Sequence, residues 1–308
     1  MIVDTHCHLY PERWRPEGRM PSDIFEVDKL LDELGAAGVD RAIVSDPHIW
    51  YGDADMNELA RCKEYNDFAA GIAAGHSGRL SALGTVVPWR GAGHLDEARR
   101  AIEELGLRGL GVATSDGGQM LDAIPDEFWE LVTGLGVPVF LHPGATVVGQ
   151  EHMGDHRLGE LCGRPLDMTL TLARAVMSGL LERHLGLKLL CAHAGGAICM
   201  IAHRLDFGHE LRDYAPLGPW NGHRLSDPPS ASVQRLFLDT VTYGPEPLRL
   251  AIRTVGARHV CFGTDHPPVP FPIERSLEVV RALRLDDADE DRVLGENAAE
   301  LFGLGEPG

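Results

Sequence analysis

Short apolar runs alternate along the chain with longer stretches in which apolar residues recur at helical spacing. This alternation is typical of a parallel sheet whose strands are joined by crossover helices. We expect strands at eight places, namely Ile2–Asp4, Arg41–Ser45, Leu80–Val86, Gly109–Ala113, Val137–His142, Leu187–His193, Arg235–Thr240 and His259–Thr264. The best-defined helices between them are expected at Val27–Ala37, Leu95–Leu105, Asp126–Leu135, Leu166–His184, Pro247–Val255 and Ile273–Leu283.

Eight strand–helix units in 308 residues predict a single α/β domain, a (β/α)8 TIM barrel that spans residues 1–308. Three irregular segments interrupt the alternation: Tyr10–Asp23, Ala145–Pro165 and Arg212–Ser232. The first two follow strands directly, so we expect them on the face of the barrel where the strands end.

Side chains that can bind a metal stand at the ends of three of these strands. His6 and His8 come with the first strand, His142 with the fifth and Asp265 with the eighth. The C-terminal ends of the strands in such a barrel meet at one face, which carries the chemistry. His6 and His8 are two residues apart, so in an extended chain both point to the same side. These four residues are the predicted metal ligands.

Imidazole nitrogens with one carboxylate favour zinc, and Mn²⁺ or Fe²⁺ also fit such a set. The fourth strand leads into Ala113-Thr114-Ser115-Asp116, without a lysine or glutamate that could bridge a second ion. We therefore expect one metal ion, with Asp116 in a turn that contains Gly117 and Gly118.

His193 ends the sixth strand and is followed by Ala194-Gly195-Gly196. We predict that it is a general acid/base, because an imidazole changes charge near neutral pH. A place among the metal ligands is the alternative. Asp265 is expected to share in proton transfer, and Asp4 either supports the site from behind the ligands or caps the loop.

Other side chains near strand ends are candidates for contact with a substrate. His48 follows Asp46-Pro47 just past the second strand. Trp50 and Phe271 also follow strand ends, so we expect them to form part of an apolar wall.

Composition excludes some classes of partner. The formal net charge is −18, which argues against nucleic acid as a partner. No apolar stretch reaches the roughly 18 residues of a membrane span. Six scattered cysteines without a Cys-x-x-Cys pair predict free thiols. A first strand that begins at Ile2 leaves no room for a signal peptide, so we expect a cytoplasmic protein.

The order of motifs resembles the amidohydrolase superfamily. The chain carries Asp-x-His-x-His at 4–8, Leu-His-Pro at 141–143, Ala-His-Ala-Gly-Gly at 192–196 and Gly-Thr-Asp-His-Pro at 263–267. The segments Gly-Gly-Ala-Ile at 195–198 and Asn-Ala-Ala-Glu-Leu-Phe-Gly at 297–303 are similar to the branch that contains amino-carboxymuconate-semialdehyde decarboxylase and related zinc-dependent decarboxylases. The resemblance covers nearly the whole chain.

This resemblance implies one zinc ion per subunit on the four ligands above and His193 as the catalytic acid/base. It also implies a homodimer in which an arginine on the helix after His193, here Arg204, reaches the neighbour's active site. A second arginine near the substrate carboxylate precedes the second strand in the family. Arg13, Arg15 and Arg19 are candidates for that place, and we choose Arg15.

The activity that the resemblance implies is metal-dependent decarboxylation of a small unsaturated or aromatic carboxylic acid, a carbon–carbon lyase reaction. In that reaction a proton from His193 adds next to the carboxylate and carbon dioxide leaves. The alternative is a hydrolase or hydratase that acts on a lactone, an amide or an unsaturated acid through zinc-activated water. A third interpretation is a barrel that binds a metal or ligand without turnover.

Overall fold

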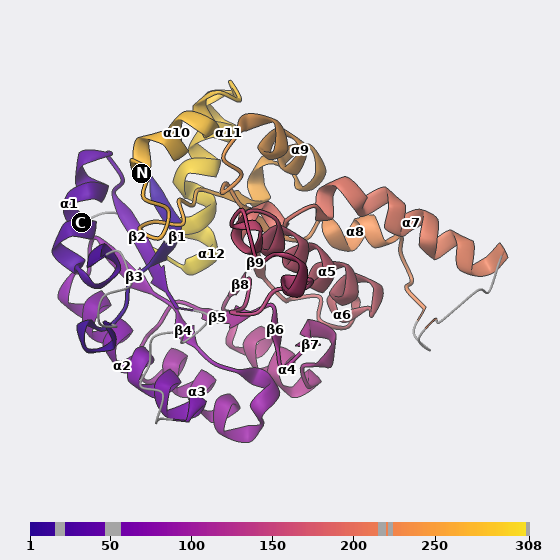
Figure 1. Cartoon of the computed structure of the whole chain (residues 1–308), viewed down its shortest axis with the longest axis horizontal. Coiled ribbons are helices and arrows are strands. Elements are labelled where there is room, and N and C mark those ends of the chain that lie inside the picture. The colour runs from indigo at the N-terminus through magenta and orange to yellow at the C-terminus, as the bar shows by residue number, and fades with distance from the viewer. Residues whose placement is uncertain (16–21, 47–56, 215–219, 221–223, 306–308) are drawn as a thin grey trace.

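The computed structural model describes residues 1–305 except 16–21, 47–56, 215–219 and 221–223. Nine parallel strand segments form the central sheet (Figure 1). They are β1 (Val3–His8), β2 (Arg41–Ser45), β3 (Leu80–Ala82), β4 (Gly84–Thr85), β5 (Leu110–Ala113), β8 (Val139–His142), β9 (Leu189–Cys191), β10 (Phe237–Asp239) and β11 (Val260–Cys261). A separate short hairpin follows β5 and consists of β6 (Ser115–Asp116) and β7 (Gln119–Met120).

The strands close into a barrel. One parallel sheet has the order β1-β2-β3, and the other has the order β11-β10-β9-β8-β5-β4. Leu83 connects β3 to β4, which together fill one strand position. On the other side, the Thr5 amide donates to the Phe262 carbonyl at 2.9 Å and the Asp265 amide donates to the His6 carbonyl at 2.8 Å. These bonds join the first strand to the last, and the predicted (β/α)8 barrel is confirmed.

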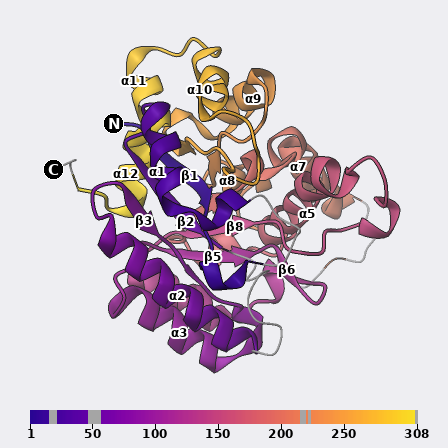
Figure 2. The same ribbon diagram turned by 60° about the vertical axis from the view of Figure 1, so that its left-hand side comes forward.

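Helices surround the barrel on its outer side (Figures 1 and 2). They are α1 (Val27–Ala36), α2 (Glu58–Gly75), α3 (Ala92–Glu103), α4 (Asp126–Leu135), α5 (Arg164–Met177), α6 (Leu180–Arg183), α7 (Ile198–Tyr214), α8 (Pro229–Val233), α9 (Pro245–Val255), α10 (Ile273–Arg281), α11 (Asp287–Asp291) and α12 (Asn297–Phe302). None of those in the described part of the chain combines the length and apolar composition that a membrane span requires.

Helix α4 shows how the sequence sets one of these elements. Asp126 and Glu127 place negative charge in its first turn, where the helix dipole favours it. Phe128, Trp129 and Val132 form its buried face. The helix ends at Gly136, whose φ of 69° is the left-handed conformation that glycine adopts easily.

The apolar interior has two parts. The larger part lies between the strands and the surrounding helices. The smaller part contains buried side chains of the strands, such as Phe140, Leu190 and Cys261, packed against Leu301 and Phe302 of α12. The last helix therefore packs against the side chains of the barrel interior, and the polar ends of the strands are left for the functional site.

Some elements differ from the sequence prediction. Strand β1 continues to His8, so the predicted ligands His6 and His8 belong to the strand itself. The helix expected at Leu166–His184 is broken into α5 and α6 at Gly179, which has a φ of 77°. Periodicity gave no bounds for α2 and α7, because their apolar residues are not gathered on one face.

Candidate metal centre and active site

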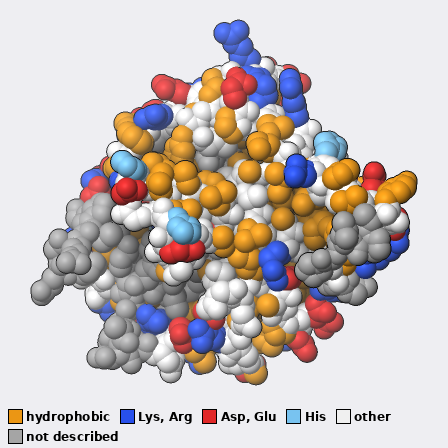
Figure 3. Space-filling model, turned by 45° about the vertical axis from the view of Figure 1, so that its right-hand side comes forward, with side chains coloured by type: hydrophobic (Ala, Val, Ile, Leu, Met, Phe, Trp, Pro, Cys, Tyr) orange, Lys and Arg blue, Asp and Glu red, His pale blue; other side chains and the backbone are white. Residues whose placement is uncertain are grey.

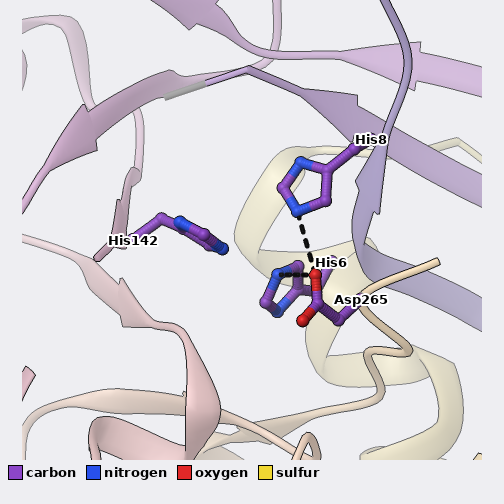
Figure 4. A group of neighbouring side chains, drawn as sticks. All are labelled: His6, His8, His142 and Asp265. Carbon is purple, nitrogen blue, oxygen red and sulfur yellow. Dashed lines mark ion pairs between the residues drawn. The ribbon is translucent and has the colours of Figure 1, made fainter. Parts of the chain in front are cut away.

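Four side chains meet at the C-terminal ends of the strands. His6 and His8 come from β1, His142 ends β8 and Asp265 follows β11. Each offers one ligand atom, and these atoms all lie within 4.8 Å of one another (Figure 4). All four residues are buried. The structure thus brings together the whole predicted ligand set.

The hydrogen bonds of the three imidazoles fix which nitrogen faces the centre. His8 Nδ1 lies 3.0 Å from the Ser45 carbonyl and His142 Nδ1 lies 3.0 Å from the Pro143 carbonyl. A carbonyl oxygen only accepts, so these Nδ1 atoms carry the proton. His6 Nδ1 lies 2.6 Å from the Asp239 carboxylate, which also accepts. Each neutral ring therefore keeps its Nε2 lone pair for a ligand, as in histidine metal sites.

The Nε2 atoms of His6 and His8 lie 3.3 and 3.2 Å from the same oxygen of Asp265 (Figure 4). In the described part of the chain, the buried Nε2 of His6 has no hydrogen-bond partner. A buried polar atom without a partner is costly unless something else satisfies it. Three imidazole nitrogens and one carboxylate oxygen fit a divalent cation.

The charges around the centre also favour a cation. Burial alone lowers the pKa of His6, but the carboxylates of Asp265 and Asp239 raise it to about 10. Burial alone raises the pKa of Asp265, whereas the positive charge of the nearby His6 holds it well below its usual range. Two carboxylates thus attract positive charge to the centre, which a proton supplies when no metal ion does.

His193 lies beside the four ligands and is not one of the group whose ligand atoms converge. Its ring centroid is 5.4 Å from those of His6 and His142. Burial lowers the pKa of His193 to about 4, so the ring is neutral at neutral pH. Its Nε2 has no hydrogen-bond partner among the described residues. The structure thus places His193 beside the ligand group and outside it, and its role in proton transfer stays a prediction.

Asp4 supports the site from behind the ligands. Its carboxylate accepts hydrogen bonds from the Thr264 hydroxyl at 2.6 Å and from the His6 amide at 3.0 Å. Burial raises its pKa to about 7. Asp4 therefore holds the backbone on either side of the cluster and does not belong to the ligand group.

The residues predicted to contact a substrate lie in different surroundings, and some of them fall outside the described residues. Arg15 forms ion pairs with Glu12 and Glu26, and Arg204 lies exposed on α7. His48 and Trp50 lie outside the described residues.

Phe271 is 50% exposed and lines a small cavity beside the site with Tyr243, Thr264 and Arg275. The guanidinium of Arg275 stacks 4.3 Å from the centroid of the Phe271 ring. This aromatic side chain is exposed at the rim, and its contact with a substrate stays a prediction.

Two residues near the centre were missed by sequence reasoning. Asp239 accepts a hydrogen bond from His6. It could have been found as an acidic residue at the end of the seventh strand, the same kind of position that pointed to Asp265. Tyr243 lies after β10 with a φ of 58°. Tyr243 is 57% exposed overall, and partial desolvation of its hydroxyl, aided by the carboxylates of Asp265 and Asp239, raises the pKa of that hydroxyl. No motif in the sequence pointed to Tyr243.

Asp116 takes no part in the cluster. It lies in the β6–β7 hairpin, whose turn contains Gly117 and Gly118 with positive φ. Its carboxylate pairs with Arg90 at 2.6 Å. The structure thus brings no carboxylate or lysine of this segment to the four ligands, and the expectation of one metal ion is retained.

Fold and site together define a (β/α)8 barrel with a candidate mononuclear metal centre at the ends of its strands. A sequence model of the amidohydrolase family matches residues 3–304. The chain therefore belongs to the amidohydrolase family.

Curated relatives carry decarboxylase names. The chain is 26% identical over 340 residues to 2-amino-3-carboxymuconate-6-semialdehyde decarboxylase of Dictyostelium discoideum, covering 98% of this chain and 91% of the relative. It is 28% identical over 224 residues to gamma-resorcylate decarboxylase of Rhodococcus jostii, covering 68% of this chain and 66% of the relative.

Solved structures share the fold. The crystal structure of 5-carboxyvanillate decarboxylase from Sphingomonas paucimobilis superposes with a TM-score of 0.87 at 22% identity, over 99% of both chains. A 5-carboxyvanillate decarboxylase from Novosphingobium aromaticivorans, complexed with manganese and 4-hydroxy-3-methoxy-5-nitrobenzoic acid, has a TM-score of 0.83 at 16% identity. That match covers 99% of this chain and 96% of the other.

Proposed function

We propose that the protein is a metal-dependent decarboxylase of a small aromatic or unsaturated carboxylic acid. The observation that carries the proposal is the convergence of His6, His8, His142 and Asp265 beside the buried, neutral His193. The names of the curated relatives support decarboxylation as the reaction. All six cysteines are unbonded, which suits a reducing compartment such as the cytoplasm.

One divalent cation would be held by the four ligands. Three imidazoles and a carboxylate favour zinc, whereas the relative from Novosphingobium aromaticivorans was crystallised with manganese. When bound, such an ion supplies a Lewis acid that polarises the oxygens of a substrate. Elemental analysis of protein purified without chelators identifies the metal.

His193 is the proton donor in this proposal. Its Nε2 gives a proton to the ring or alkene carbon that bears the carboxylate, and a new C–H bond forms. The bond between that carbon and the carboxylate then breaks, its electron pair restores the unsaturated system, and carbon dioxide leaves. A bound carboxylate nearby would raise the pKa of His193 above about 4, so substrate binding favours the protonated form.

Asp265 is proposed to take part in proton transfer, because its carboxylate acts electrostatically on His193 and favours the protonated ring. Phe271, His48 and Trp50 are proposed to contact the substrate. Arg15 is proposed to contact the substrate carboxylate. To do so it must exchange one of its present carboxylate partners for the substrate.

Arg204 is proposed to act in a homodimer. It lies on α7, which extends away from the barrel (Figure 1). The same helix exposes several large apolar side chains, namely Met200, Phe207, Leu211 and Tyr214. Figure 3 turns the right-hand side of Figure 1, where α7 lies, towards the reader, and hydrophobic side chains gather on the face it shows. A second copy that covers them would bring Arg204 towards another subunit's strand ends.

The test is a panel of carboxyl-labelled aromatic and unsaturated acids that includes 2,6-dihydroxybenzoate and 5-carboxyvanillate. We expect labelled carbon dioxide, and we expect a drop of about 100-fold or more in His193→Asn because general acid catalysis is lost. His76→Asn, at the histidine that follows α2, is the matched control. Hydrolysis or hydration across the panel without carbon dioxide would replace decarboxylation with the alternative reaction.

A further inference from the structure

Asp239 links two functional side chains that are far apart in the sequence. It ends β10 and is fully buried. One carboxylate oxygen, Oδ2, accepts from His6 Nδ1 at 2.6 Å and from the His193 amide at 3.0 Å. The other oxygen, Oδ1, accepts from the amides of Ala194 and Val241 at 2.8 and 3.1 Å. The Asp239 carboxylate thus accepts four hydrogen bonds.

The backbone that carries His193 needs such a restraint. His193 and Ala194 have φ values of 52° and 51°, a left-handed conformation that side chains with a Cβ disfavour. Gly195 and Gly196 continue the turn with φ values of 70° and 65°. Strained conformations of this kind persist only where the surroundings hold them in place. The two amides at the start of this turn are the ones that donate to Asp239.

His6 needs a restraint of a different kind. It binds a metal through Nε2 only if its proton is on Nδ1, and an acceptor at Nδ1 fixes that tautomer and the angle of the ring. For His8 and His142 the acceptor is a backbone carbonyl. For His6 it is the side chain of Asp239, so this restraint can be removed by mutation.

We infer that Asp239 is a positioning residue that fixes the Nδ1–H tautomer of His6 and clamps the left-handed turn that presents His193. The inference rests on the proposed metal centre for its first half only. The second half concerns the backbone at 193–194 and holds with or without a metal ion. Asp239 couples the ligand sphere and the acid/base through one side chain.

Asp239→Asn is the informative substitution, because it keeps the shape of the side chain and removes one acceptor. If its amide nitrogen takes the place of Oδ2, it faces the donors of His6 and His193. If it takes the place of Oδ1, it faces those of Ala194 and Val241. Either orientation sets donors against donors. In the first, His6 turns to the tautomer whose Nε2 carries a proton and cannot bind metal.

Two measurements that do not depend on turnover test the inference. Titration with Mn²⁺, followed by its electron paramagnetic resonance signal, should give a dissociation constant raised by about 10- to 100-fold in Asp239→Asn. Hydrogen exchange of the metal-free protein should show faster exchange in the peptide that contains residues 193 and 194. Glu97→Gln is the control, since Glu97 is also buried but bonds Asn66 and Arg100 elsewhere.

A kinetic split separates the two halves of the role. At saturating metal, kcat of Asp239→Asn should stay at least about tenfold below wild type, because the turn of His193 remains loosened. In a His193→Ala background, Asp239→Asn should cost little further kcat, because residues that act as a unit are non-additive. Equal losses in both backgrounds overturn the claim that Asp239 acts through His193.

A direct test on the wild-type chain remains if Asp239→Asn does not fold. Nitrogen-15 labelling of histidine in the zinc-loaded protein should show a proton on Nδ1 of His6, whose signal is identified by its loss in His6→Gln. A proton on Nε2 instead overturns the inference. If wild-type protein binds neither Zn²⁺ nor Mn²⁺, the proposed metal centre fails. Tight wild-type binding that Asp239→Asn leaves unchanged overturns only the role of Asp239.

Discussion

The hydroxyl of Thr264 donates a hydrogen bond of 2.6 Å to the carboxylate of Asp4, which lies at the other end of the chain. The Thr264 amide also donates to Asp4, at 3.2 Å. These bonds lie where the last strand of the barrel meets the first, next to the ligands His6 and Asp265. The closure of the barrel and the support of the proposed metal centre thus use the same pair of residues.

Thr264→Val should destabilise the fold by about 1–3 kcal/mol, because it removes a donor from a fully buried carboxylate. Denaturant unfolding of the metal-free protein measures the loss. Thr254→Val is the matched control, since the Thr254 hydroxyl donates to the Leu250 carbonyl of its own helix in an exposed setting. Equal stability of both variants would show that the Asp4–Thr264 bond does not hold the barrel closed.

Metal binding should depend on single ligands. Wild-type protein is expected to retain about one Zn²⁺ or Mn²⁺ per chain, and His8→Ala should lose most of its affinity because an open ligand position remains. Saturation with metal at about 100 times Kd should stabilise wild type by about 2.7 kcal/mol. Elemental analysis and thermal unfolding measure these two effects.

His203→Ala is the control for that experiment, because this histidine is 93% exposed at its side chain and pairs with Asp206 away from the four ligands. It should bind metal as wild type does. Full metal occupancy in His8→Ala would contradict the ligand assignment.

The turn after His193 should be sensitive to added bulk. A Cβ at Gly196 would lie 2.2 Å from the Pro165 carbonyl oxygen. Gly196→Ala should therefore cost about 3 kcal/mol, the sum of overpacking and backbone strain. Gly38→Ala has a similar positive φ but meets nothing within 4 Å, so it should cost about 1 kcal/mol. Urea unfolding of both variants measures the loss of unfolding free energy and so separates the steric clash from the backbone strain. Equal losses would show that α5 shifts to make room for the added methyl group.

Asp167 should make stability depend on pH. Burial raises its pKa, although hydrogen bonds from Thr114 and Val148 act in the opposite direction. A folded-state pKa above the unfolded value of about 4 means that its stabilising contribution is present below that pH. The contribution is lost as the pH rises through the folded-state pKa. The stability of wild type relative to Asp167→Asn should therefore fall between about pH 4 and neutrality.

Urea unfolding of both proteins at several pH values measures this difference. Asp155→Asn, at a carboxylate that is 75% exposed, should show no such trend. A constant difference between wild type and Asp167→Asn would mean that the buried carboxyl keeps its ordinary pKa.

The exposed apolar side chains of α7 should govern assembly. Phe207 is 62% exposed, and a charge there would have to be buried in the proposed dimer. Phe207→Glu is expected to shift the protein to monomer in sedimentation velocity and to lower activity, because Arg204 no longer reaches a neighbour. Leu185→Glu, at an exposed leucine outside α7, should leave the assembly intact. A monomeric wild type at micromolar concentration would refute the dimer.

The sequence predicted the barrel and the group of candidate ligands because both signals are local. The strands that contain His6, His8 and His142 are four to six residues long, so a short stretch of sequence shows both where each strand ends and which side chain stands there. The barrel then places every such end at one face. The convergence of distant residues followed from topology alone.

The role of Asp239 could not be predicted in the same way. Three of its four donors are backbone amides, and their direction depends on the left-handed turn at His193. The extent of α7 was also hidden, because it has no single apolar stripe of the kind that marks a packed helix. The contacts of Asp239 and the extent of α7 depend on how distant parts of the chain pack together in three dimensions.

Asp265 and the His6–His8 pair stand near opposite ends of the polypeptide, yet the proposed centre needs them together. A nascent chain that has emerged only as far as β10 already displays three imidazoles but lacks the carboxylate that completes the set. The complete ligand set would then exist only after synthesis has passed Asp265. Ribosome-bound intermediates would hold metal poorly, and loading would coincide with the final docking of β11 against β1.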